Sequence, residues 1–245
     1  DHAPHNAFTD LIRYQDRWFC TYREDIGHHM EGSAGKIRIL TSDTGWEWES
    51  AALLELEGDL RDPKLSITPD GQLLVTYFRR YNPHRFPDQL EMQYVQRSAN
   101  GSDWTRAVPV GYPNRWLWRI TWHAGKAYGI DRGGPPDQAP FSQPRHGRLL
   151  VSEDGHFFNP IAEVPDGGEA TLQFLDDDTA LCLRRPFSNW AFLGKSQPPY
   201  TSWEWVNTGT RLGGPDFLQI PDGRFIAGGR IFEPEEHMSL CWLDV

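Results

Sequence analysis

The stretch "PKLSITPDGQLLVTYFR", residues 63–79, decides the fold of this chain. Two runs of residues that favour β-strands flank Pro-Asp-Gly, a tight-turn sequence, and this pattern predicts a β-hairpin. The same pattern of strand, turn and strand occurs in four other places, residues 10–24, 118–132, 170–185 and 216–230. The five turns centre near residues 16, 70, 125, 177 and 222, so the hairpins recur about every 50 residues.

A second motif lies between the hairpins. "TSDTGWEW" (41–48) follows the pattern Ser/Thr-x-Asp-x-Gly-x-x-Trp, and weaker copies stand at 97–104, 151–158 and 195–205. We expect the aspartate to accept backbone N–H bonds, the glycine to adopt a positive φ, and the aromatic residue to pack between neighbouring sheets. The copies are in phase with the hairpins, which indicates a true structural repeat.

A period of about 50 residues with four short strands in each unit is typical of β-propeller blades. We therefore predict an all-β chain, one β-propeller domain over residues 1–245, with five blades visible. A two-sheet sandwich is the alternative, although sandwiches lack this long self-similarity. The segment "MSLCWLDV" (238–245) is expected to be the third strand of the fifth blade. Because a closed propeller leaves no open edge, we expect a sixth blade that is missing here or supplied otherwise.

Composition narrows the range of functions. The net charge of −10 and the pI of about 5.3 argue against a nucleic-acid partner, which usually meets a basic patch. No apolar run approaches 18 residues, so no membrane span is expected. Three cysteines without a spacing pattern argue against a disulfide framework or a zinc site, and we predict no metal and no cofactor.

Charged residues recur at the open ends of the predicted hairpins. In a propeller these ends lie near one mouth of the central channel. Arginine forks bind carboxylates in two places, and carboxylates can act as acid and base on a glycosidic bond. The pattern predicts a pocket for an acidic sugar, with a ring of structural salt bridges as the alternative. The residues are Asp10, Arg23, Glu24, Arg61, Asp62, Lys64, Arg79, Arg80, Arg119, Asp131, Arg132, Glu169, Arg184, Arg185, Arg211, Asp216 and Arg230.

The motif at 41–48, the blade period and the segment "GGEATLQFLDDDTALCLRR" (167–185) resemble the exo-sialidase (neuraminidase) superfamily of β-propellers, whose repeats carry this Asp-box. The resemblance is closer to a bacterial sialidase-like branch, through "HNAFTDL" (5–11), "DLRDPKLSITPDG" (59–71), "LWRITWHAGKAYG" (117–129) and "RLGGPDFLQIPDGRFIAGGR" (211–230). It implies a glycoside hydrolase that removes a terminal acidic sugar from a carbohydrate or glycoconjugate.

Sialidases hold the substrate carboxylate with three arginines. The resemblance implies that Arg184 is one of them and that it faces the channel mouth together with Glu169, the partner of the family's nucleophile. Arg185 is expected to be structural. The first family arginine is absent, because Ala7 stands near its position, and Arg23 or Arg61 could replace it. Arg119, Arg230 and His28 complete the expected substrate-binding set.

The family's acid/base aspartate lies in the loop after the first hairpin, which is "REDIGHHMEGSAG" (23–35) in this chain. Asp25 is the candidate, and His28 or His29 could take its role because histidine titrates near neutral pH. None of Tyr22, Tyr77, Tyr81 and Tyr112 lies in a motif matching the family's tyrosine nucleophile.

Without such a tyrosine, an inverting mechanism becomes plausible, with Asp62 or Asp216 activating a water molecule. Two alternatives stay open: a non-catalytic carbohydrate-binding propeller, and a glycosidase or lyase that acts on uronic-acid glycans.

Overall fold

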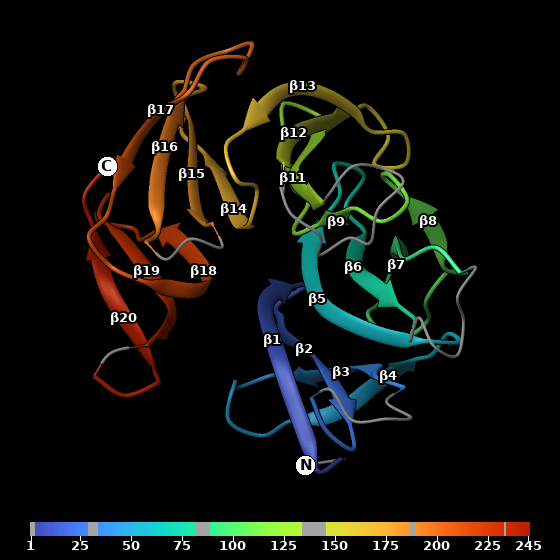
Figure 1. Cartoon of the computed structure of the whole chain (residues 1–245). Coiled ribbons are helices and arrows are strands. Elements are labelled where there is room, and N and C mark those ends of the chain that lie inside the picture. Colours follow the sequence, from blue (N-terminus) through green and yellow to red (C-terminus); the bar gives the residue numbers. More distant parts are fainter. Residues whose placement is uncertain (1–2, 29–33, 82–88, 134–145, 187–189, 233) are drawn as a thin grey trace. The chain divides into compact units, whose positions relative to one another are not determined.

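The computed structural model describes residues 3–28, 34–81, 89–133, 146–186, 190–232 and 234–245. In these ranges the chain forms twenty strands in five successive antiparallel sheets and no helix (Figure 1). This confirms the prediction of an all-β chain with the blade pattern of a β-propeller. The chain divides into two compact units, residues 1–116 with 155–157, and residues 117–154 with 158–245. A single domain over the whole chain stays a prediction.

The first unit contains two four-stranded sheets in which each strand pairs with the next along the chain. The turns of both predicted hairpins lie where the sequence places them, near residues 16 and 70. The first sheet consists of β1 (His5–Tyr14), β2 (Arg17–Asp25), β3 (Lys36–Ser42) and β4 (Glu49–Leu54), and the second of β5 (Asp59–Ile67), β6 (Leu73–Arg80), β7 (Met92–Ser98) and β8 (Val108–Val110).

The second unit contains the other three sheets, and their hairpins again match the predicted turns. The short strand β9 (Trp116–Leu117) lies where the chain passes from one unit to the other. The last sheet has three strands, and its third strand occupies the segment predicted for it. The strands are β10 (Thr121–His123), β11 (Lys126–Gly133), β12 (His146–Ser152) and β13 (Asn159–Val164); β14 (Glu169–Phe174), β15 (Ala180–Arg185), β16 (Phe192–Ser196) and β17 (Glu204–Asn207); and β18 (Leu212–Gln219), β19 (Phe225–Ile231) and β20 (His237–Leu243).

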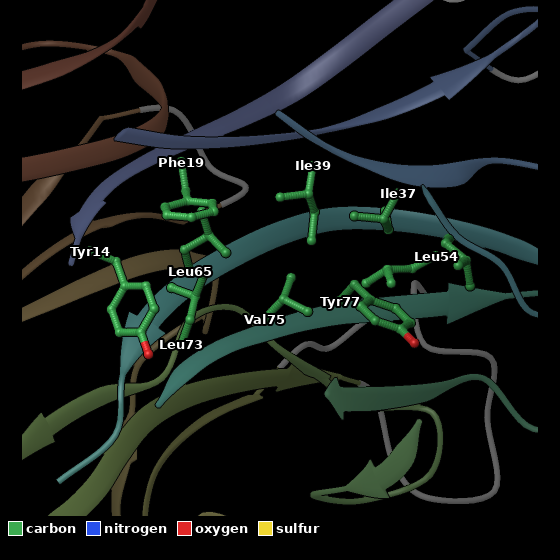
Figure 2. Close-up of a cluster of buried hydrophobic side chains, with 10 residues drawn as sticks. Tyr14, Phe19, Ile37, Ile39, Leu54, Leu65, Leu73, Val75 and Tyr77 are labelled. Atoms are coloured by element: carbon green, nitrogen blue, oxygen red, sulfur yellow. The ribbon is translucent and has the colours of Figure 1, made fainter. Parts of the chain in front are cut away.

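The core of the first unit lies between its two sheets, as Figure 2 shows. Alternate residues of β6, namely Leu73, Val75 and Tyr77, point to one face because side chains alternate along a strand. They meet Ile37 and Ile39, which share a face of β3 in the same way. All five are fully buried, and burying each such side chain contributes about 1.5–3 kcal/mol.

In the second unit, β15 has a core on both of its faces. Ala180 and Cys182 pack against residues of the third sheet, whereas Leu181 and Leu183 pack against residues of the fifth sheet. A central strand that is covered on both faces reads as a continuous apolar run, and "ALCL" is such a run. The alternation continues into the two arginines that follow, so they also lie on opposite faces.

The motif at 41–48 forms a tight turn, with two differences from expectation: Trp48 is 36% exposed instead of packed between sheets, and Asp43 has a different partner. Gly45 adopts the expected positive φ of 83°, and Trp48 Nε1 donates to the Gly45 carbonyl at 3.0 Å. The backbone N–H of Gly45 bonds to the hydroxyl of Ser42 at 2.9 Å. The carboxylate of Asp43 instead accepts from Arg17 Nε at 2.6 Å.

The most degenerate copy of the motif, 195–205, makes the same turn. Trp203 Nε1 donates to the carbonyl of Tyr200, three residues earlier, at 3.0 Å. Tyr200 has a φ of 67° at the position that glycine takes in the other copies. The turn therefore forms without glycine when the tryptophan bond is present.

Candidate functional site

The first strands of three sheets have the same irregularity near their start. In β1, β5 and β18 the register shifts, which marks a β-bulge, and the first residue of each bulge has a positive φ. These residues are Phe8 (64°), Asp62 (46°) and Gly214 (57°). Bulges re-aim side chains and are frequent beside active sites. Each bulge lies among the charged residues that the sequence singled out.

Glu169 opens β14 and lies directly opposite Arg185 of β15. Both nitrogens of the Arg185 fork donate to its carboxylate, at 2.9 and 2.6 Å. We expected Glu169 and Arg184 to face the channel mouth together, but Glu169 shares a face with Arg185 instead. In an antiparallel pair, residues in direct register share a face, and Arg184 is in register with Ala170.

Two further groups surround the Glu169 carboxylate. The backbone N–H of Gly214, in the bulge of β18, donates to Oε2 at 2.7 Å, and Arg132 Nη1 lies 4.0 Å from Oε1. Burial alone raises the pKa of Glu169, but Arg132 and Arg185 together with the two hydrogen bonds outweigh it, so the net pKa lies below the ordinary value. Glu169 is ionised at neutral pH and suits the role of a base or an electrostatic partner.

Arg184 bonds to the turn that precedes Glu169. Its guanidinium lies 4.3 Å from the ring centroid of Trp205, and its Nη1 donates to the Pro165 carbonyl at 2.6 Å. A weaker contact of 3.4 Å reaches the Gly167 carbonyl. Only 3% of Arg184 is exposed, so it presents almost no surface to a substrate. Substrate binding by Arg184 stays a prediction that this geometry does not support.

A second carboxylate lies on β18, two residues after Gly214. Asp216 Oδ2 accepts from Arg119 Nη2 at 2.8 Å, and 49% of the Asp216 side chain is exposed. The predicted residues Arg119 and Asp216 are therefore brought together. Asp216 is open to solvent, as a carboxylate that activates water must be.

Three arginines gather around one aromatic ring that the sequence analysis did not consider. The guanidinium carbons of Arg211, Arg230 and Arg185 lie 4.2, 4.9 and 5.8 Å from the ring centroid of Phe232. Arg230 also pairs with Glu236 at 2.9 Å, with both side chains about half exposed. Phe232 follows β19 directly, and only the folded sheet shows that it meets residues of β15 and of the segment before β18.

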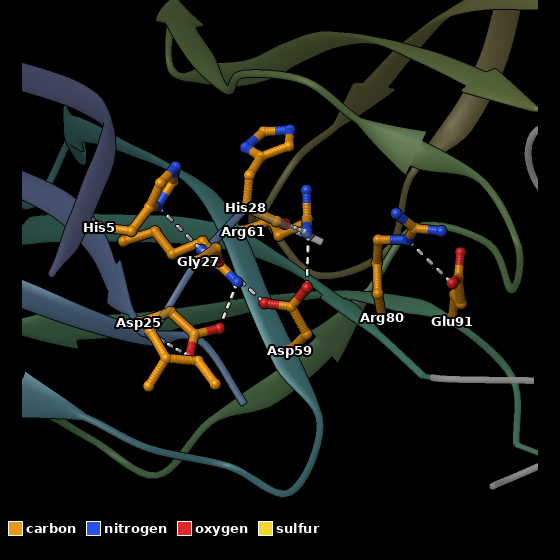
Figure 3. A network of polar contacts seen from close by, with 10 residues as sticks. His5, Asp25, Gly27, His28, Asp59, Arg61, Arg80 and Glu91 are labelled. Carbon is orange, nitrogen blue, oxygen red and sulfur yellow. Dashed lines mark hydrogen bonds and ion pairs between the residues drawn. The ribbon is translucent and has the colours of Figure 1, made fainter. Parts of the chain in front are cut away.

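In the first unit, one unpredicted carboxylate organises the expected residues (Figure 3). Asp59 accepts from Arg23 Nε at 2.8 Å and from Arg61 Nε at 2.6 Å. Arg23 also donates to Asp25 at 2.5 Å, and the Arg23 side chain has no exposed surface. Asp59 precedes Arg61 by two residues on β5, so both share a face, a signal that was present in the sequence.

The expected acid/base loop is tied to these arginines. Arg23 Nη1 donates to the Gly27 carbonyl at 3.0 Å, and Arg61 donates to the His28 carbonyl (Figure 3). The Asp25 side chain is 6% exposed, which is little for a residue that protonates a leaving group. His29 lies outside the described residues.

Asp62 lies in the bulge of β5 and is 5% exposed, which leaves little room for a water molecule to reach it. Of the two candidate water-activating aspartates, Asp216 therefore has the better access. Three of the tyrosines considered as nucleophiles, Tyr22, Tyr77 and Tyr81, are buried, and burial raises the pKa of each phenol. A nucleophilic phenol needs the opposite shift.

The described residues also bear on metal binding, disulfides and membrane-spanning helices. Within the described ranges, no three histidine, cysteine, aspartate or glutamate side chains are placed to hold a metal ion. All three cysteines are described, and none forms a disulfide. A search of the described residues finds no helix with the length and apolar character needed to cross a membrane.

No protein-family model and no curated protein matches the sequence. Solved structures do match in fold. A protein of unknown function from Dyadobacter fermentans DSM 18053 is 16% identical with a TM-score of 0.79, and the match covers 98% of this chain and 79% of that chain. The Hadza microbial sialidase Hz136 is 13% identical with a TM-score of 0.73, over 94% of this chain and 54% of that one.

The GH93 α-L-arabinofuranosidase of Fusarium graminearum, solved with arabinobiose, is 14% identical with a TM-score of 0.71, over 96% of this chain and 76% of that one. This chain therefore spans about half the length of the sialidase and three quarters of the arabinofuranosidase. At these identities the likeness shows the fold alone. The chain shares its β-propeller fold with sialidases and another glycosidase.

Proposed function

We propose that this chain is a glycoside hydrolase of the sialidase-like type, which holds a terminal acidic sugar by its carboxylate and cleaves the glycosidic bond. The observation that carries the proposal is the gathering of Arg185, Arg211 and Arg230 around Phe232, beside the ionised Glu169. The shared fold with sialidases and an arabinofuranosidase supports it at the level of glycosidases.

The charges around Phe232 favour an anionic ligand. Glu169 neutralises Arg185 and Glu236 neutralises Arg230, whereas the contact described for Arg211 is the aromatic ring. A half-buried arginine gains most from a carboxylate that accepts two parallel hydrogen bonds. Arg211 is therefore the group assigned to the substrate carboxylate in this proposal.

The two carboxylates take separate roles. Glu169, whose pKa is held below its ordinary value, stays ionised and stabilises positive charge that develops at the sugar. Asp216, half exposed and oriented by Arg119, takes the proton of the attacking water, and the departing aglycone oxygen leaves as an anion that takes a proton from solvent. The buried tyrosines favour this inverting scheme over a tyrosine nucleophile.

One observation favours a second candidate, a carbohydrate-binding protein without turnover. Asp25, the expected proton donor, is nearly buried and ion-paired with Arg23. Such a protein would bind the same acidic sugars, uronic acids included, and release no product.

The test measures aglycone release from an aryl sialoside and an aryl uronide. We expect turnover of the sialoside, and we expect Arg211→Ala to raise KM by about 10-fold or more, because a hydrogen bond to a charged group contributes about 1.5–3 kcal/mol. Glu169→Gln should lower kcat. The control is Arg224→Ala. Arg224 also lies over an aromatic ring, that of Trp242, but it stands at the turn between β18 and β19 instead of at the open end of that hairpin.

Saturable binding of either sugar without any turnover would favour the binding protein over the hydrolase. Turnover of the uronide alone would redirect the proposal to uronic-acid glycans. An Arg211→Ala variant with unchanged KM would contradict the assignment of Arg211.

A further inference from the structure

The turn between β3 and β4 forms a pocket together with the start of β2. The pocket has a volume of about 250 Å³, and every residue that lines it belongs to the first unit. Pockets for larger organic ligands begin at about 300 Å³, so this one suits a ligand the size of a single sugar ring. The lining includes Arg17, Thr41, Asp43, Glu47, Trp48 and Glu49.

The turn itself does not require the Asp43 carboxylate, as the copy of the motif at 97–104 shows. There the N–H of Gly101 bonds to a serine hydroxyl at 2.8 Å, and Trp104 Nε1 donates to the Gly101 carbonyl at 3.2 Å. The turn at 41–48 has the same two bonds. The copy has Ala99 at the position of Asp43. This carboxylate on the pocket wall is therefore an addition to what the turn needs.

The buried wall of the pocket contains a hydroxyl group without a partner. Thr41 lies in direct register with Glu49, so both side chains project from the same face of the sheet. Thr41 is 3% exposed, and its Oγ1 has no hydrogen-bond partner in the described part of the chain. A buried polar group without a partner is unfavourable, and it indicates a bonding partner that enters the pocket from outside the chain.

Two charged groups of the pocket also have unused hydrogen-bonding capacity. Arg17 donates from Nε to Asp43 at 2.6 Å and from Nη2 to Glu49 at 2.8 Å. Its Nη1 has no acceptor among the described residues, and the exposed Glu47 carboxylate bonds to none of them either. The pocket therefore offers both donors and acceptors to a ligand.

The charges and the aromatic wall of the pocket favour a neutral sugar. Three carboxylates lie around the single guanidinium of Arg17, which disfavours an anion. A cation would use the carboxylates but not the N–H groups of Arg17, whereas each hydroxyl of a sugar both donates and accepts. The exposed part of the Trp48 ring supplies an apolar wall for the C–H groups of the sugar.

We propose that this pocket binds one neutral sugar residue of a glycan. The C–H face of the sugar packs on Trp48, and its hydroxyls accept from Arg17 Nη1 and donate to Glu47. Rotation of the Thr41 side chain about χ1 turns its buried hydroxyl toward the ligand. The site lies in the first unit alone and does not rest on the proposed hydrolysis, so either proposal can fail without the other.

The test is titration calorimetry at neutral pH with the methyl glycosides of galactose, glucose and N-acetylglucosamine. We expect at least one of them to bind, with one site per chain. Thr41→Val keeps the shape of the side chain and removes its hydroxyl, and Glu47→Ala removes an exposed carboxylate. Each should raise Kd by about 3- to 10-fold, the usual effect of one hydrogen bond. Thr41→Val should unfold at no lower denaturant concentration than the wild type, because the hydroxyl it loses has no partner.

Asp103→Ala is the matched control, since Asp103 is exposed and stands at the position of Glu47 in the copy at 97–104. It should leave Kd unchanged. Three results would overturn the proposal. The first is that none of the neutral glycosides binds, and the second is that Thr41→Val or Glu47→Ala binds them as tightly as the wild type. The third is that glucuronic acid, an anionic comparison, loses as much affinity in these two variants as the glycosides do.

Discussion

Arg184 and Arg185 are neighbours on β15, but their side chains lie on opposite faces of the strand and contact different residues. Arg185 shares a face with Leu181 and Leu183 and bonds to Glu169, whereas Arg184 shares a face with Cys182 and stacks on Trp205. The two-residue period of a strand determines this division. The apolar run "ALCL" before the arginines already contained the information, since it has two faces with two different neighbours.

Replacing Arg184 by lysine tests whether its planar guanidinium group or only its positive charge stabilises the fold. We expect Arg184→Lys to lower the free energy of unfolding by about 2 kcal/mol, because an ammonium group cannot stack on Trp205 while it bonds to the Pro165 carbonyl. Arg224→Lys is the matched control, since Arg224 lies over Trp242 but is 61% exposed, and it should change stability by less than about 0.5 kcal/mol. Denaturant unfolding measures both, and equal effects would contradict a structural role for Arg184.

At the scale of elements, a glycine in the turn before β14 and a glycine of β18 hold Glu169 in place. Gly168 precedes it with a φ of 120°, and Gly214 donates to it from the bulge of β18 with a φ of 57°. A side chain at position 168 would overlap the backbone carbonyl of Arg185, whereas position 214 has open space around it. Gly168 is needed because no side chain fits there and because its φ is positive. Gly214 is needed for its positive φ alone.

These differences predict unequal effects of the same substitution. Gly214→Ala should lower the free energy of unfolding by about 1–2 kcal/mol, the usual cost of a left-handed residue. Gly168→Ala should lower it by more than that and should also shift Glu169, because the β14–β15 backbones must separate. Denaturant unfolding curves compare the two variants. Similar losses of unfolding free energy would contradict the prediction, because they would show that the turn before Glu169 accommodates a side chain at position 168.

At the scale of the whole molecule, the ionised Glu169 makes stability depend on pH. Its folded-state pKa lies below the unfolded value, so the unfolded chain takes up the proton first as the pH falls. The stability that Glu169 contributes is thus complete above about pH 5 and is lost as the pH falls through the folded pKa.

Glu169→Gln should be less stable than the wild type at neutral pH, by up to about 3 kcal/mol, because Arg132 and Arg185 lose the charge that they face. The gap should narrow as the pH falls below 4.5, the ordinary glutamate value. Glu163→Gln, at an exposed position of β13, should follow the wild type throughout. Denaturant midpoints between pH 3 and pH 7 measure the effect, and a gap that stays constant would contradict an ionised Glu169.

The sequence by itself determined the five hairpins, their turns and the all-β class, because strand alternation and turn chemistry act between residues that are close along the chain. It also indicated which strand ends carry charge. It did not determine the partners: Asp59 joins Arg23 and Arg61, and Phe232 meets three arginines, only where separate strands come together. Charge is visible residue by residue, but which arginine neutralises which carboxylate depends on sheet register, bulges and packing, and these exist only in the folded chain.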